Sequence, residues 1–91
     1  MAHTSYHDLA EKLQQAHKLV EVGAFYRHYK DATKHYTVLA LALQEESEAV
    51  CVVYQTSHPS GLIWVRDLDD WLASVKNAAG ETVPRFEKVS N

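Results

Sequence analysis

The sequence predicts an α+β domain in which one N-terminal helix packs on a small, curled and mostly antiparallel sheet. Apolar residues repeat at helical spacing only near the N-terminus, over residues 5–22. Beyond them, short runs of strand-forming residues alternate with turns to the end of the chain. Four or five short strands joined by tight turns indicate an SH3-like, partly open β-barrel, with one short helical turn after the strand that holds Trp64.

Length and composition are those of one small globular domain. The chain has 91 residues, of which 46% are hydrophobic and 23% charged. A net charge of −3 argues against a surface built to neutralise phosphates, so nucleic acid is a disfavoured partner. No apolar run approaches the roughly 18 residues of a membrane span. The single cysteine, Cys51, excludes an internal disulfide framework and favours a reducing, cytoplasmic compartment.

The predicted helix has a start signal, an apolar stripe and a stop signal. Ser5 is a good N-cap, and Gly23 is suited to the left-handed conformation past a helix end. The stripe recurs at i, i+4, i+7 and i+11 and consists of Leu9, Leu13, Ala16 and Val20. A lone helix of this length is marginal in water, so it needs a surface to cover. We expect residues 1–22 to form a helical extension and residues 23–91 a small β domain.

The strands are expected at residues 25–29, 35–43, 49–55, 61–68 and 73–75, with an edge segment at 82–86 and turns at 30–34 and 77–80. Residues 35–43 are apolar on both faces, which predicts a strand covered on both sides. In the strand that holds Trp64, alternation places Leu62, Trp64 and Arg66 on one face and Ile63 and Val65 on the other. We expect the first face to line a pocket and the second to fill the core. Asp67 is then expected to cap the helical turn that ends at Leu72.

Four short motifs in this order resemble the small bacterial DUF1653 family. They are Tyr-Arg-His-Tyr-Lys at 26–30, Val-Val-Tyr-Gln at 52–55, Trp-Val-Arg at 64–66 and Pro-Arg-Phe at 84–86. The resemblance covers about residues 23–86 and leaves the N-terminal helix outside it. The chain departs from the family pattern at Asp31, which stands in place of a Gly, and at Asp67, which stands in place of a Pro. Gln44 and Glu45 also replace a His and a Ser before Glu46. Because the family is named for its unknown function, the resemblance implies a fold and a set of residues but no chemistry.

The candidate ligand-binding residues form a polar and aromatic set: Arg27, His28, Tyr29, Glu46, Trp64, Arg66 and Arg85. An arginine beside an aromatic ring can stack on a planar group and hold a carboxylate or phosphate in a fork of hydrogen bonds. This pattern favours a non-catalytic binding module for a small planar or anionic ligand, a peptide or a nucleic-acid segment. A structural alternative has Arg27 and Arg66 paired with acidic residues (Glu46, Asp67, Asp69 or Asp70) while the aromatic rings fill the core.

Two further functions remain open from the sequence. An enzyme, or an accessory domain of one, would use His28 and Glu46 as an acid–base pair. A protein-interaction domain would present the stripe of its N-terminal helix to a partner or to a second copy, as a monomer or a homodimer. No cofactor is expected, since the chain has no glycine-rich phosphate loop. No metal is expected either, since His3 and His7 have no third ligand at suitable spacing.

Overall fold

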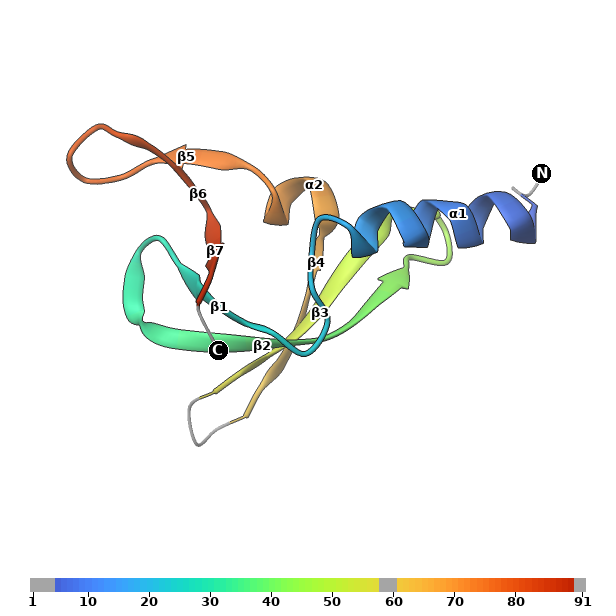
Figure 1. The fold of residues 1–91 in the computed structure, drawn as a ribbon, viewed down its shortest axis with the longest axis horizontal. Helices are drawn as coiled ribbons and strands as arrows, with labels where there is room; N and C mark the ends of the chain where they lie inside the picture. Colours follow the sequence, from blue (N-terminus) through green and yellow to red (C-terminus); the bar gives the residue numbers. More distant parts are fainter. Residues whose placement is uncertain (1–4, 58–60, 90–91) are drawn as a thin grey trace.

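The computed structural model describes residues 5–57 and 61–89. Its elements in chain order are α1 (Tyr6–His17), β1 (Phe25–His28), β2 (Asp31–Leu43), β3 (Val50–Thr56), β4 (Ile63–Asp67), α2 (Leu68–Trp71), β5 (Ser74–Lys76), β6 (Thr82–Pro84) and β7 (Phe86–Lys88). The predicted fold class is confirmed, with an N-terminal helix, a curled antiparallel sheet and a short helix after β4 (Figure 1). Met1–Thr4, which include His3, lie outside the described residues.

The main sheet has five strands in the order β4-β3-β2-β1-β7, and each neighbouring pair is antiparallel. It does not close, so the architecture is that of a partly open barrel. β5 and β6 form a separate two-stranded sheet. The expected single edge segment 82–86 is therefore split between the two sheets at Arg85. Its backbone N–H donates to Ala73 and its carbonyl accepts from Tyr29.

β2 is longer than predicted and changes faces at a bulge. It starts at Asp31, so the expected turn over residues 30–34 shrinks to Tyr29 and Lys30. The register with β3 shifts between Val38 and Ala40. One extra residue in a strand moves every later side chain to the opposite face. As a result Leu41 packs against the core, whereas Leu39 is 39% exposed.

The N-terminal helix is shorter than predicted. The Ser5 hydroxyl caps it as expected and accepts from the backbone N–H of Asp8 at 3.2 Å. The helix ends at His17, well before Gly23, because the chain turns there and directs Val20 into the core. Ala16 and Val20 are each 1% exposed. The helix therefore covers the domain's own sheet along the face that carries Val38.

Aromatic rings dominate the core beneath the helices. α2 directs Trp71 inward, where its ring stacks on Phe86 with centroids 3.7 Å apart and planes 3° apart. The rings of Tyr26 and Tyr54 meet the same indole edge to face, with ring centroids 5.3 and 4.9 Å from it. Asp67 occupies the N-cap position of α2 as predicted. Its side chain makes no cap hydrogen bond and instead accepts a weak one from the thiol of Cys51.

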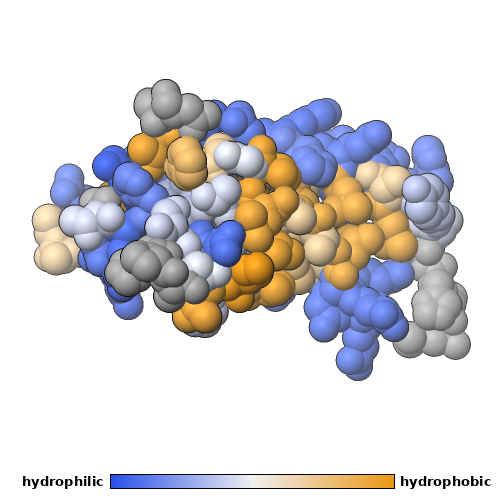
Figure 2. All heavy atoms as spheres, turned by 90° about the horizontal axis from the view of Figure 1, so that it is seen from below, coloured by the Kyte–Doolittle hydropathy of each residue, from blue (hydrophilic) through white to orange (hydrophobic). Residues whose placement is uncertain are grey.

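The opposite face of the sheet has no helix over it among the described residues. Ile63 and Val65, expected in the core, are 59% and 67% exposed because they lie on this face of an edge strand. The register places Ile63 in one row with Phe25, which is also exposed. Figure 2 shows hydrophobic side chains gathered across the middle of the molecule on the side away from the helices. The expectation that β2 is covered on both faces is therefore wrong.

Candidate functional site

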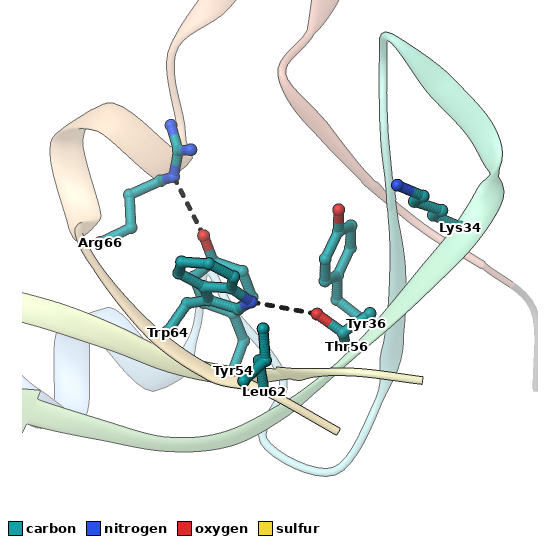
Figure 3. Close-up of a pocket in the computed structure, with 7 residues that line it drawn as sticks. All are labelled: Lys34, Tyr36, Tyr54, Thr56, Leu62, Trp64 and Arg66. Carbon is teal, nitrogen blue, oxygen red and sulfur yellow. Dashed lines mark hydrogen bonds between the residues drawn. The ribbon is translucent and has the colours of Figure 1, made fainter. Parts of the chain in front are cut away.

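A cavity of about 420 Å³ opens on the concave, helix-side face of the sheet, where β2, β3 and β4 lie side by side. Its lining consists of Lys34, Tyr36, Tyr54, Thr56, Leu62, Trp64 and Arg66 (Figure 3). The predicted face of Leu62, Trp64 and Arg66 therefore does line a pocket. We call this cavity the tyrosine–tryptophan pocket.

The strand register explains why these side chains converge. Trp64 lies directly opposite Tyr54, and Tyr36 directly opposite Thr56, so the four project from the same face of three adjacent strands. The indole N–H of Trp64 donates to the Thr56 hydroxyl at 3.0 Å. The rings of Tyr36 and Tyr54 meet edge to face at 5.5 Å. These contacts fix the aromatic walls while leaving Trp64 47% exposed.

Arg66 is held in place at one side of the pocket. Its Nε donates to the Tyr54 hydroxyl at 3.4 Å, and one terminal nitrogen lies 2.7 Å from Asp70. Its guanidinium carbon lies 5.2 Å from the centroid of the Phe86 ring. Burial lowers the pKa of Arg66, but the Tyr54 hydrogen bond and the Asp70 carboxylate outweigh burial and raise it overall. Arg66 is therefore a fixed positive charge at neutral pH.

A second cation lies across the aromatic rings from Arg66. Lys34 projects from β2 beside Tyr36, and the two cations flank the rings in Figure 3. Burial, followed by the neighbouring Tyr54 and Asp31, raises the pKa of Tyr36 above its usual value of 10.0, although Arg66 opposes the shift. The Tyr36 hydroxyl thus stays protonated at neutral pH and can donate a hydrogen bond.

The structure divides five of the seven predicted residues between two cavities. Arg27, His28 and Tyr29 line a separate cavity of about 290 Å³ with Asn77, Val83, Pro84 and Glu87. Arg27 forms an ion pair with Glu87, a partner that the sequence did not suggest. The His28 ring lies edge-on to Phe86 at 5.0 Å. Burial and then the positive charges of Arg66, Arg85 and Lys30 lower the pKa of His28. This imidazole is thus neutral at neutral pH.

Arg85 and Glu46 belong to neither cavity lining. Arg85 lies 3.6 Å from the same Asp70 carboxylate that pairs with Arg66. Its Nε is buried and has no hydrogen-bond partner within residues 5–57 and 61–89. Glu46 lies in the turn after β2, where its backbone N–H donates to the Gln44 side chain. His28 is next to the opposite end of this 13-residue strand, roughly 40 Å of chain away, so the two do not form an acid–base pair.

Several side chains that the fold brings together were not predicted from the sequence. Tyr36, Tyr54 and Thr56 could have been found from strand register, but the bulge in β2 hides that register from a sequence pattern. A cluster on α1 was also not predicted: His7, Asp8 and Glu11 each bring one possible metal-ligand atom within 4.8 Å of the others. All three are exposed, and His7 already approaches Glu11 at 3.9 Å.

Comparisons with known proteins agree with the motif pattern. The chain matches the family described as "Protein of unknown function (DUF1653)" over residues 24–88. A solved structure of a DUF1653 protein from Bordetella bronchiseptica is 39% identical. The match covers 74% of this chain and 85% of that one, with a TM-score of 0.63. No curated protein matches the chain. No helix in the described part of the chain is long and apolar enough to cross a bilayer.

Proposed function

The chain belongs to the DUF1653 family, and we propose that it is a non-catalytic binding module whose tyrosine–tryptophan pocket takes a small planar anion. The observation that carries the proposal is the arrangement of that pocket. Three aromatic rings from three strands line a cavity with a cation on either side. A planar ring would stack on the exposed Trp64 indole. Its carboxylate or phosphate would take hydrogen bonds from Arg66 or Lys34.

The size and polarity of the pocket support a small ligand. Its volume of about 420 Å³ lies within the range of about 300–1,000 Å³ for small-molecule sites. Tyr36 and Arg66 supply polar groups that fix orientation, and the rings supply apolar surface. A nucleotide or an aromatic carboxylate has this combination of a flat ring and an anionic group. A longer nucleic-acid segment is disfavoured by the net charge of −3.

A non-catalytic role is supported by the separation of His28 from Glu46. These two residues are the acid–base pair that the sequence offered, and they lie near opposite ends of β2. General acid–base catalysis needs both groups within hydrogen-bond reach of one substrate. We also propose a reducing, cytoplasmic location, which the single buried thiol of Cys51 supports.

The test is a titration followed by ¹⁵N amide NMR. The probes are AMP, adenosine, inorganic phosphate, benzoate, short single-stranded RNA and DNA, and an acidic peptide. We expect saturable shifts at Tyr36, Trp64 and Arg66 with AMP or benzoate, and much smaller ones with adenosine or phosphate alone. A response to the peptide or to single strands alone would assign the pocket to those ligands. No response to any probe at millimolar concentration would overturn the proposal.

Matched variants make the test specific. Lys34→Gln removes an exposed cation from the pocket and should weaken AMP binding about two- to fivefold, because an exposed ion pair contributes about 0.2–1 kcal/mol. Arg27→Gln makes the same change in charge at the other cavity and serves as the control. Equal losses in the two variants would mean that overall charge, not the pocket, holds the anion.

A further inference from the structure

β4 is an edge strand of the main sheet, and no other strand pairs with its outer side within residues 5–57 and 61–89. It lies at the end of the strand order and pairs with β3 without a bulge. Three consecutive apolar side chains on it, Ile63, Trp64 and Val65, are 59%, 47% and 67% exposed. Natural edges are usually shielded by short strands, charges, prolines or bulges, because a bare edge pairs with other strands. The opposite edge, β7, has three residues and carries Glu87 and Lys88.

The backbone of β4 alternates between groups that face β3 and groups that face outward. The N–H of Thr56 donates to the carbonyl of Leu62, which makes these two residues a hydrogen-bonded pair. In an antiparallel ladder such pairs occur at every second residue. Ile63 and Val65 therefore point both their N–H and C=O groups away from β3, and Asp67 points its N–H outward while its carbonyl lies at the N-cap of α2. These are the groups that another strand would engage.

We propose that the occupant of this edge is a second copy of the chain, paired antiparallel through β4 about a two-fold axis at Val65. In this register Val65 lies opposite Val65 of the second copy, and Ile63 opposite its Asp67. Each of these three residues of β4 then lies opposite one of the same three residues in the second copy. On the concave face, Trp64 lies opposite Arg66 of the second copy, and the symmetry repeats this cation–π pair.

Neighbouring registers are less favourable for reasons visible in the same five residues. Pairing must keep the concave faces of the two copies on one side of the joined sheet. Because side chains alternate between the two faces along a strand, the strands can shift only by two residues at a time. One shift puts Arg66 opposite Arg66, which is a like-charge pair. The other puts Trp64 opposite Trp64 and removes the Trp–Arg pairs. Either shift leaves two hydrogen-bonded residue pairs where the centred register has three. The match between cation and indole thus selects both the partner and the register.

A single five-residue strand gives a small interface, so the dimer should be weak and concentration-dependent. The inference goes beyond the proposed function and does not depend on the pocket having a ligand. Sedimentation velocity of the full chain should show a shift from monomer to dimer between about 10 µM and 1 mM. Under the same conditions, exchange of the outward amides of Ile63, Val65 and Asp67 should slow as concentration rises.

Two matched variants locate the interface. Val65→Lys puts two ammonium groups opposite each other at the two-fold axis and should weaken dimerisation at least tenfold. Leu39→Lys makes a similar change at an exposed apolar residue on β2, which is not an edge strand, and should leave dimerisation unchanged. Amide spectra of both variants establish that they are folded.

Each other result overturns the proposal. A chain that stays monomeric to 1 mM has no such interface. A dimer that survives Val65→Lys uses another surface. A dimer lost equally in both variants forms through the open face of the sheet and not through its edge. Concentration-independent exchange at the Val65 amide would contradict strand pairing, whatever the sedimentation shows.

Discussion

Removing Trp71 should cost far more stability than removing Trp64, although both tryptophans lie within residues 24–88, the stretch that matches the family. Trp71 is 2% exposed and contacts three aromatic rings, Phe86 by stacking and Tyr26 and Tyr54 by their edges. Trp64 is 47% exposed and contacts solvent over much of its ring. The same substitution, Trp→Ala, therefore tests burial directly.

The size of the effect follows from packing. Removing a buried Trp costs about 3–5 kcal/mol through lost burial and the cavity left behind. A chain of this length has a total stability of about 5–14 kcal/mol. A loss of about 4 kcal/mol corresponds to a fall in Tm of roughly 16–32 °C for a small domain. Trp64→Ala loses half-exposed surface and one hydrogen bond to Thr56, so we expect about 1 kcal/mol or less.

Urea denaturation followed by far-ultraviolet circular dichroism measures both variants on one scale, independent of which indole remains. Tryptophan fluorescence of each variant adds a check, because Trp71 alone should emit at shorter wavelength than Trp64 alone. A loss below about 1.5 kcal/mol for Trp71→Ala, or equal losses for the two variants, would refute the assigned core.

Three smaller predictions follow from individual environments. Because the pKa of His28 is lowered in the folded chain, the unfolded chain binds the proton more readily. Stability should therefore fall as pH drops from about 6.5 through the folded pKa, and His28→Gln should flatten that part of a urea-midpoint profile. Val20→Ala should cost about 2 kcal/mol in the same assay, while Leu19→Ala, at a side chain 60% exposed, should cost little. Burial and then Asp67 raise the pKa of the Cys51 thiol, so a disulfide reagent at pH 7 should react slowly with the folded chain and rapidly in urea. Rapid reaction without urea would show that the thiol is accessible.

The sequence predicted the elements better than their environments. Alternation correctly placed Leu62, Trp64 and Arg66 on one face, because strand geometry is local. It could not tell that β4 is an edge strand, and for that reason Ile63 and Val65 were wrongly assigned to the core. Strand order depends on long-range pairing, which no local pattern contains.

The pocket illustrates the same limit. Trp64 and Arg66 were predicted from their own strand, but Tyr36 and Tyr54 join them only through the register of β2 and β3. The bulge after Val38 offsets that register by one residue. Arg27 and His28 were grouped with Trp64 and Arg66 because of their chemistry, yet they line a separate cavity in the fold.

Asp70 forms ion pairs with two arginines that belong to different parts of the domain. Arg66 comes from the rim of the tyrosine–tryptophan pocket, and Arg85 from the junction between the two sheets. If an anion binds Arg66 as we propose, it would compete with Asp70 for the guanidinium, and the Asp70 carboxylate would then pair more strongly with Arg85. Occupancy of the pocket and the stability of the sheet junction would then be thermodynamically linked, and linkage is reciprocal. Changes near Arg85, far along the chain from the pocket strands, would tune the affinity of a site that they never touch.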